Sequence, residues 1–414
     1  MTNLFVGIDI SMKDFKVQLM NDTGETIAKR RRFLNDQPGM DSLVELVLTI
    51  CQANSIDRVV IGLESTSVYS WHLQMGLACD HRLTPYECQV YPFNPKVVAN
   101  FKKAYVDLPK NDWTDAWVIA DRLRFGRLPE NSQVDFRYLP LQRLTRFRYH
   151  LTQSVTREKN YFLTNLFLKF NTLQQNEIFS NLFGATSEAI LTEFLSPDEI
   201  VARPLEDLID FLMEKGNKHF TDPNATAKAL KKAAHNAHRL KGGLLEPVNL
   251  ILTTSIETIR CLEKQIKVID KAIAKEISHF KNSLDSVPGL GPVSCAGLIA
   301  EIGDIRRFPN DSALAKYAGL TWRGHQSGEF EADETPLTKT GNAYLRYYFV
   351  QAANQVRQHE PEYRQFYTRK YRESKTHHHR RALVLAARKL VRMVDALLRS
   401  NQLYRPQGQR SDSA

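Results

Sequence analysis

The stretch FVGIDIS (residues 5–11) decides the fold, because it joins a short apolar strand to an acidic side chain at the strand's end. Residues 4–10 have the alternation of a half-buried β-strand, and Asp9 stands where that strand runs out. A stretch of the same form, VVIGLEST (59–66), carries Glu64 at the end of a second strand. The two stretches predict two strands that each end in a carboxylate.

Two further acidic residues open an amphipathic helix in KNDWTDAWVIADRLR (110–124). Asp112 and Asp115 are three residues apart, so they share one face of that helix. Carboxylates grouped at strand ends and on a facing helix repel one another unless a cation compensates them, and their hard oxygen atoms suit Mg²⁺ or Mn²⁺. If the four carboxylates converge, they form a site suited to metal-dependent phosphodiester chemistry.

The elements around these residues predict a mixed sheet covered by helices. A meander of three strands is expected first, with a hairpin turn at NDTG (21–24), and helix, strand, helix, strand and helix follow. This order, together with the placement of the carboxylates, matches the ribonuclease H-like fold. The expected strands span residues 4–10, 13–20, 25–33, 58–63 and about 82–88, and the expected helices span about 38–53, 68–77 and the segment from 112 onward.

The composition indicates a basic globular protein. The 414 residues are 43% hydrophobic and 25% charged, which is typical of two or three ordered domains and excludes wholesale disorder. The net charge of +10 favours a polyanionic partner. Residues 355–410 contain 14 Lys or Arg and 4 Asp or Glu, an excess of ten positive charges that equals the excess of the whole chain. A basic C-terminal surface therefore binds a polyanion or, alternatively, is a solvated charged helix.

Cysteine usage and hydropathy predict a cytoplasmic protein. The five cysteines form no C-x-x-C pair and no zinc-finger spacing, which indicates a reducing compartment. No stretch reaches the roughly 18 apolar residues of a membrane span, and the start MTNLFVGID has the pattern of a strand, so no membrane partner is expected. The run His377–His379 either binds metal or phosphate or faces solvent, and its role is left open.

The central part of the chain is expected to be helical. One helix there carries an apolar stripe at the three- and four-residue spacing of coiled-coil a and d positions. The stripe spans barely two heptads, so it is either a dimer contact or the core-facing side of a helix. Its members are Ile259, Leu262, Ile266, Ile269 and Ile273.

The stretch SVPGLGPVSCAGLIAEIGD (286–304) has the form of a helix-hairpin-helix. Gly289 and Gly291 allow a tight turn, and the amides at the start of the following helix can hold a phosphate oxygen without reading sequence. DNA-backbone binding is expected here, with an ordinary structural turn as the alternative.

The stretch LAKYAGLTWRGHQSGEFEADETPLTKTGNAYLRYYF (314–349) gathers glycines, hydroxyls and cations. Ser327 lies in a glycine-flanked loop, and a serine of this kind is a candidate nucleophile for phosphoryl transfer when cations stabilise the transition state. The nearby cations include Arg323, Lys339 and Arg346. On spacing alone, Gln326-Ser327-Gly328 is equally well an ordinary turn.

The chain resembles the insertion-sequence transposases with a DEDD, RuvC-like domain, which are the bridge-RNA-guided serine recombinases and have Piv-type DNA invertases as relatives. The resemblance rests first on VGIDIS, GLEST and KNDWTDAWVIADR (110–122). It rests further on PGLGPVSCAGLIAEIGD, FPNDSALAKYAGLTWR, Q-S-G and TKTGNAYLR. These motifs bracket nearly the whole chain.

The resemblance implies a fold and a division of the chain into domains. It implies an α/β, ribonuclease H-like (RuvC-like) mixed-sheet domain followed by all-α parts. The expected domains are a RuvC-like DEDD domain (1–140), a helical or coiled-coil region (141–283), a mainly helical transposase domain with the helix-hairpin-helix and the serine (284–400), and a flexible basic tail (401–414).

The resemblance also implies an activity and a set of residues. Asp9, Glu64, Asp112 and Asp115 correspond to the metal-binding tetrad, for Mg²⁺ or Mn²⁺, and Ser327 corresponds to the nucleophile. The implied enzyme is a transposase that cuts and rejoins DNA through a 5′-phosphoserine intermediate. Many relatives have two serines before the glycine, whereas Gln326 precedes Ser327 here. The residues expected to contact nucleic acid are Gly289, Gly291, Arg323, Lys339, Arg346, Arg369, Lys370, Arg372, Arg380 and Arg381.

The implied partners are double-stranded target and donor DNA, a structured bridge RNA, and further copies of the chain in a dimer to a tetramer. The implied location is the bacterial cytoplasm, in association with the nucleoid. The leading alternative is a Holliday-junction-resolvase-type endonuclease that hydrolyses DNA with metal and leaves Ser327 idle. A non-catalytic nucleic-acid scaffold, whose acids form a buried polar network, is the third class.

Overall fold

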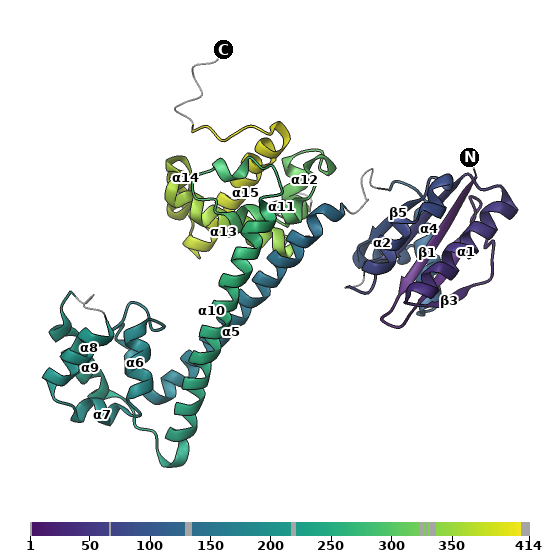
Figure 1. Cartoon of the computed structure of the whole chain (residues 1–414). Helices are drawn as coiled ribbons and strands as arrows, with labels where there is room; N and C mark the ends of the chain where they lie inside the picture. The colour runs from purple at the N-terminus through teal and green to yellow at the C-terminus, as the bar shows by residue number, and fades with distance from the viewer. Residues whose placement is uncertain are drawn as a thin grey trace. The chain divides into compact units, whose positions relative to one another are not determined.

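The computed structural model describes residues 2–65, 68–128, 135–216, 221–322, 326–327, 330–331 and 337–406 (Figure 1). The chain divides into two compact units, residues 1–135 and residues 136–414.

The first unit contains a mixed five-stranded sheet with the strand order β3-β2-β1-β4-β5. The strands are β1 (Asn3–Ile10), β2 (Asp14–Met20), β3 (Arg31–Leu34), β4 (Arg58–Glu64) and β5 (Gln89–Phe93). The β1–β2 and β2–β3 pairs are antiparallel, and the β1–β4 and β4–β5 pairs are parallel. The mixed sheet expected from the sequence is therefore confirmed.

Helices cover both faces of this sheet. Alternate residues of β1, such as Leu4 and Val6, pack in one core with α1 and α2, and Phe5 packs in a second core with α3 and α4. The helices are α1 (Gln37–Asn54), α2 (Trp71–Cys79), α3 (Pro95–Lys102) and α4 (Asp112–Arg124). Gly7 and Asp9 follow Phe5 at intervals of two residues, so they lie on the face that α4 covers.

Two of the expected strands were misplaced. The strand expected over about 82–88 is wrong: the 3-10 helix η1 (His81–Tyr86) lies there, and β5 begins only at Gln89. The Asp80 side chain accepts a hydrogen bond from the Arg82 amide at 2.9 Å, and Pro85 has no amide to give to a ladder, so the local chemistry favours a turn. The strand expected over 25–33 is shorter, since β3 begins at Arg31.

Two adjacent glycines let α4 approach the sheet closely. Gly7 of β1 pairs with Gly62 of β4. A Cβ atom on Gly7 would lie 2.1 Å from the Ala116 carbonyl oxygen and 2.4 Å from the Ala120 nitrogen, both in the backbone of α4. The backbone of α4 thus rests directly on β1, one helical turn beyond Asp112. This contact fixes the height of the helix start above the sheet.

The second unit is built on two long helices that lie side by side, α5 (Leu139–Gln175), which follows the 3-10 helix η2 (Phe136–Tyr138), and α10 (Leu245–Ile277) (Figure 1). Ile259 packs with Phe162 of α5 in one hydrophobic cluster, and Ile273 packs with Leu141 of α5 in another. The apolar stripe of α10 therefore faces α5 of the same chain, which supports the core-facing interpretation. None of the described helices combines the length and the apolar character that a bilayer span requires.

The remaining described elements pack at the two ends of this pair, each end with its own core. One end holds α6 (Ala185–Glu193), α7 (Pro197–Ala202), α8 (Leu205–Lys215), α9 (Pro223–Asn236) and η3 (Gly242–Leu244). The other end holds η4 (Leu284–Ser286), α11 (Pro292–Ile302), η5 (Ile305–Arg307), α12 (Asp311–Ala318), β6 (Gln326–Ser327), β7 (Phe330–Glu331), α13 (Ala343–His359), α14 (Pro361–Glu373) and α15 (His378–Ser400).

The expected helix-hairpin-helix has a full second helix and a reduced first arm. The single 3-10 turn η4 precedes the Pro-Gly-Leu-Gly turn, and α11 follows it. A Cβ on Gly289 would lie 2.9 Å from His359 Cδ2 and 3.0 Å from the Gln355 oxygen, so this glycine packs against the end of α13. Gly291 is exposed, and a Cβ there would meet no atom within 4 Å.

Substitution of Gly7 by alanine tests the close approach of α4. We expect Gly7→Ala to lower the free energy of unfolding of the first unit by about 1–3 kcal/mol, because the new methyl group overlaps the α4 backbone. The measurement is the apparent midpoint of urea unfolding, followed by circular dichroism. Gly243→Ala is the matched control, since its Cβ would meet no atom within 4 Å. Equal midpoints for the wild type and Gly7→Ala would contradict the packing argument.

Candidate metal centre and serine hairpin

Two of the four carboxylates end neighbouring parallel strands. Glu64 is the last residue of β4, and Asp9 is the last but one of β1. The pair Ile8 and Leu63 precedes them in the β1–β4 ladder, so Asp9 and Glu64 are adjacent in register. Both follow a glycine by two residues, and both therefore lie on the face of the sheet that α4 covers.

The other two carboxylates lie in the first turn of α4. Asn111 caps this helix, and its side-chain oxygen accepts a hydrogen bond from the Thr114 amide at 2.9 Å. Asp112 and Asp115 follow the cap, where the positive end of the helix dipole stabilises negative charge. The cap fixes where the helix begins and therefore where these two side chains leave it.

The pKa of Asp9 indicates that the four carboxylates lie near one another. Burial and, after it, the negative charges of three neighbours together raise the pKa of Asp9 to about 6. Those neighbours are Asp112, Asp115 and Glu64, and the ammonium of Lys16 acts in the opposite sense. The other three carboxylates thus lie within electrostatic reach of Asp9 at one edge of the sheet.

Two lysines compensate part of this negative charge. The Lys16 ammonium donates to the Asp112 carboxylate, and Lys16 lies opposite Asp9 in the β1–β2 ladder. Lys102, at the end of α3, donates from Nζ to Asp115 Oδ1 at 2.6 Å. The lysine side chains are only 18% and 22% exposed. Neither lysine was identified from the sequence, because each contact joins residues that the fold alone brings together.

The chemistry of the donor set fits a hard divalent cation, whereas its present geometry does not yet enclose one. Four carboxylates within electrostatic reach of one another are the ligands that Mg²⁺ and Mn²⁺ prefer. Among the described residues, however, no three His, Cys, Asp or Glu side chains are arranged to hold a metal ion. Asp112 and Asp115 are instead engaged by ammonium groups.

Ser327 lies in a short β-hairpin of the second unit. Its backbone belongs to β6, which pairs with β7 through Gln326 with Glu331 and Ser327 with Phe330. The side chains of residues 323–336 are outside the described set, so the side chain of Ser327 and the whole of Arg323 lie outside it. At the base of this excursion Trp322 and Leu337 form a β-bridge, and the Thr338 amide donates to the Thr321 oxygen at 2.8 Å.

Two glycines and an arginine close the base of the hairpin. Gly319 and Gly341 have positive φ angles of 67° and 99°. A Cβ on Gly319 would lie 2.2 Å from the Thr340 oxygen, so only glycine fits this crossing of the two chain segments. Arg346 Nη1 donates to the carbonyl oxygens of Ala318 and Lys339 at 3.1 and 3.2 Å. Arg346, expected to contact nucleic acid, is thus engaged with the backbone of the hairpin base, while Lys339 is exposed.

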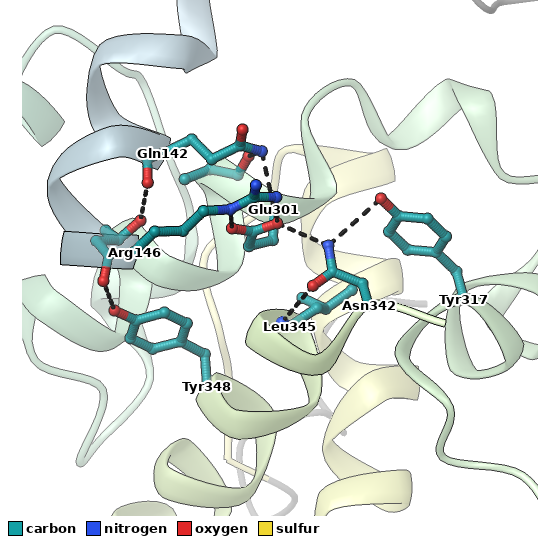
Figure 2. A network of polar contacts seen from close by, with 9 residues as sticks. Gln142, Arg146, Glu301, Tyr317, Asn342, Leu345 and Tyr348 are labelled. Carbon is teal, nitrogen blue, oxygen red and sulfur yellow. Dashed lines mark hydrogen bonds and ion pairs between the residues drawn. The ribbon is translucent and has the colours of Figure 1, made fainter. Parts of the chain in front are cut away.

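A buried charged network adjoins this base (Figure 2). The Glu301 side chain is 0% exposed and accepts hydrogen bonds from Arg146 Nε and Nη2 at 2.7 and 2.8 Å. Asn342 Nδ2 donates to Glu301 Oε2 at 2.6 Å. The sequence carries one signal of this network that was missed, namely a single charged residue in the otherwise apolar and small segment PVSCAGLIAEI (292–302).

The remaining candidates for nucleic-acid contact lie on α14 and α15. An open groove of about 600 Å³ is lined by Arg364, Gln365, Thr368, Arg369, Arg372 and Glu373. Lys370 Nζ forms an ion pair with Glu373 at 2.6 Å, and Arg380 and Arg381 lie exposed in the first turn of α15. In the histidine run, His379 Nδ1 is 2.6 Å from the Tyr367 hydroxyl, and His378 Nδ1 is 2.9 Å from the Tyr371 oxygen.

Comparison with known proteins relates both units to one family. Residues 6–170 match a family model described as "Transposase", for the DEDD transposases of the IS110 type, and residues 281–368 match one described as "Transposase IS116/IS110/IS902 family". The two ranges together cover more than half of the chain. They include all four carboxylates and the hairpin with Ser327.

Individual relatives agree with this assignment. The chain is 26% identical over 315 residues to an insertion element IS116 protein of Streptomyces clavuligerus, which covers 75% of this chain and 76% of the relative. It is 22% identical over 415 residues to an insertion element IS900 protein of Mycobacterium paratuberculosis, with 97% of each chain covered. A pilin gene-inverting protein of Moraxella bovis is 30% identical over 130 residues, 31% of this chain and 40% of the relative. The chain therefore belongs to the IS110/IS116/IS902 family of transposases.

Proposed function

We propose that this transposase is a site-specific DNA recombinase that moves its own insertion element by cutting and rejoining DNA, with a metal held by Asp9, Glu64, Asp112 and Asp115 and with Ser327 as the nucleophile. The observation that carries the proposal is the convergence of the four carboxylates, which is expressed in the raised pKa of Asp9. The strand order β3-β2-β1-β4-β5 supports a ribonuclease H-like, RuvC-like assignment for the first unit.

The four carboxylates would hold Mg²⁺ or Mn²⁺, which supplies Lewis-acid polarisation of a phosphodiester oxygen when it is bound. The protein's own contribution is to assemble the negative charge beforehand. Lys16 and Lys102 balance part of the charge of Asp112 and Asp115, while burial and like charge disfavour the ionised form of Asp9. Lys16 and Lys102 would have to release Asp112 and Asp115 for these carboxylates to hold a cation, and the charge of that cation would offset the repulsion at Asp9.

Ser327 would perform the covalent step. Its hydroxyl oxygen attacks the phosphorus of a DNA phosphodiester, a new bond forms between Oγ and phosphorus, and the 3′ oxygen leaves with the proton that the serine gives up. Attack of a 3′ hydroxyl from another strand on this 5′-phosphoserine reverses the step and releases the serine. Because the phosphate stays in an ester bond throughout, strands are rejoined without an external energy source.

The basic surface of α14 and α15 is proposed to bind nucleic-acid phosphates. The groove beside Arg369 and Arg372 and the exposed Arg380 and Arg381 support this assignment, because clustered arginines favour a polyanion. The partners proposed are target and donor DNA, a structured bridge RNA that specifies both, and further copies of the chain in a dimer to a tetramer, acting in the bacterial cytoplasm at the nucleoid.

A second candidate function is a resolvase-type endonuclease. The carboxylate cluster favours it, since all four acids lie within the first unit and need no serine to activate water. The two functions differ in the product. Hydrolysis leaves free ends, whereas serine attack leaves protein attached to DNA.

Trapping of the covalent intermediate distinguishes these functions. The full chain is expressed from a plasmid that carries its own gene with the flanking DNA, and protein–DNA adducts are collected under denaturing conditions. We expect wild-type protein to give a protease-sensitive adduct and Ser327→Ala to give none, because the alanine has no oxygen to attack phosphorus.

Ser278→Ala is the control, since Ser278 is exposed and its hydroxyl bonds only the Lys275 carbonyl oxygen among the contacts described. Ser327→Ala protein that still cleaves DNA to free ends would reject the serine and support the endonuclease. Loss of the adduct in both variants would also reject the assignment to Ser327.

Metal affinity provides a test that does not depend on DNA. In a Mn²⁺ titration of the full chain followed by EPR, Asp9→Asn should weaken binding by about 10–100-fold, because a ligand is lost. Lys16→Gln should strengthen binding by about twofold to fivefold, because the ion no longer competes with an ion pair of about 0.5–1 kcal/mol. Lys13→Gln is the control, since it removes the same charge from an exposed position. Weaker Mn²⁺ binding by Lys16→Gln would contradict the competition.

The pH dependence of Mn²⁺ binding follows from the same site. With the pKa of Asp9 raised to about 6 from the ordinary 3.8, protonated Asp9 is abundant below pH 6 and cannot bind a cation. Affinity should therefore fall about tenfold per pH unit below 6, with release of one proton on binding. The metal-free first unit should lose stability as pH rises from 4 to 6, because its folded state binds that proton more tightly than the unfolded chain does. Asp9→Asn should show neither effect.

A further inference from the structure

We propose that Asn342, held by the buried Glu301, is a positioning residue that sets the place of the hairpin carrying Ser327. The role of this hairpin in strand exchange rests on the function proposed above, and the physical tether is argued from contacts that do not involve Ser327. The tether joins the base of the hairpin to a charged network in the core of the second unit (Figure 2).

The hairpin is an excursion between two helices. The chain leaves α12 at Gly319 and enters α13 after Asn342. The two arms meet again at the base, where the Thr321 and Thr338 hydroxyls are 3.1 Å apart and Trp322 pairs with Leu337. The position of the hairpin base is therefore determined by whatever holds these two arms.

Asn342 links both arms to each other. Its backbone N–H donates to the Tyr317 carbonyl oxygen at 2.7 Å, so the returning arm is bonded to the last turn of α12. Gly341 lies beside this bond, and a Cβ there would come within 2.2 Å of the same Tyr317 oxygen. The contact is tight enough that a displacement of residue 342 carries the hairpin base with it.

Glu301 supplies a fixed reference for Asn342. A fully buried carboxylate must be paired and hydrogen-bonded, and here Arg146 of α5 binds both of its oxygens. The Arg146 guanidinium stacks on the Tyr344 ring at 4.6 Å from the ring centre. One turn away, the Tyr348 hydroxyl donates to the Thr145 carbonyl oxygen at 2.8 Å. The network thus fastens α5, α11 and α13 together, and Asn342 Nδ2 attaches the hairpin to it.

The two functions of the Asn342 side chain can be separated. Oδ1 caps α13 by accepting from the Leu345 amide at 3.0 Å, and Nδ2 forms the tether to Glu301. Aspartate retains the capping oxygen and is as good a cap as asparagine. It also replaces the donor by a second carboxylate oxygen facing Glu301, so the tether becomes a repulsion. Asn342→Asp therefore changes the tether and preserves the cap.

The experiment combines recombination with a structural signal. The full chain is labelled with 5-fluorotryptophan, which gives four fluorine resonances, one of them from Trp322 at the hairpin base and three from the first unit at Trp71, Trp113 and Trp117. Asn342→Asp should shift the Trp322 resonance alone. Recombination junctions, counted by quantitative PCR in cells that carry the gene with its flanking DNA, should fall about 10–100-fold, as expected for a small displacement of a reacting group.

Asn310→Asp is the matched control, because Asn310 caps α12 through the Ala313 amide at 2.9 Å and is exposed.

The outcomes separate the tether from the proposed function. An unshifted Trp322 resonance or unreduced junctions in Asn342→Asp would overturn the tether. If Asn342→Asp does not fold, Asn342→Ser, which keeps a capping oxygen but cannot reach Glu301, should give the same changes in the same direction, and wild-type signals in that variant would equally overturn the tether. Junctions that persist in Ser327→Ala would reject the serine mechanism alone, since the resonance of Trp322 does not depend on it.

Discussion

Mutual repulsion of four carboxylates is the constraint on which the first unit depends. Asp9 and Glu64 end adjacent strands, Asp112 and Asp115 begin α4, and the charges of the other three all raise the pKa of Asp9. A fold holds such groups together only if other contacts supply the stability that the charges remove. Here the apolar core between α4 and the sheet does so, and the pair Gly7 and Gly62 lets the backbone of α4 reach the strand.

In the second unit, the buried Glu301 carboxylate is paired with a positive charge, whereas Asp9 lies among like charges. Glu301 is more deeply buried than Asp9, yet Arg146 and Asn342 satisfy its oxygens. Removal of one partner from such a pair costs about 3–5 kcal/mol because it leaves an uncompensated charge, so the network behaves as a rigid joint. At Asp9, by contrast, burial and three like charges disfavour the ionised carboxylate, which is the condition under which a cation binds. A buried carboxylate that is paired and hydrogen-bonded, such as Glu301, stabilises one structure, whereas a carboxylate among like charges, such as Asp9, favours the binding of a cation.

Local patterns predicted much of the first unit. The apolar runs in FVGIDIS and VVIGLEST mark two central strands, although both faces of these strands are buried and not one as the alternation predicts, and Asp112 with Asp115 marks the first turn of a helix. The strand expected near residue 85 was wrong, because the Asp80 cap and Pro85 favour a 3-10 turn over a ladder. Apolar character alone does not reveal that local competition.

Long-range ion pairs could not be predicted from the sequence. Lys16 and Asp112 are 96 residues apart, and Arg146 and Glu301 are 155 apart.

The same limit explains why the cations around Ser327 were assigned to nucleic acid. Arg346 lies next to a candidate nucleophile in the sequence, and the natural inference is a phosphate contact. In the fold, the Arg346 guanidinium donates to the Ala318 and Lys339 carbonyl oxygens, and it therefore stabilises the hairpin base.

A nucleophile that must attack one phosphorus atom needs a defined position more than it needs nearby charge, since displacement by about 1 Å can cost 100-fold in rate. At the hairpin base, Gly319 and Gly341 allow backbone contacts too close for a Cβ atom, and the Asn342 side chain bonds Glu301. The described polar residues of this segment therefore hold the hairpin base in place, which fits the role proposed for Ser327.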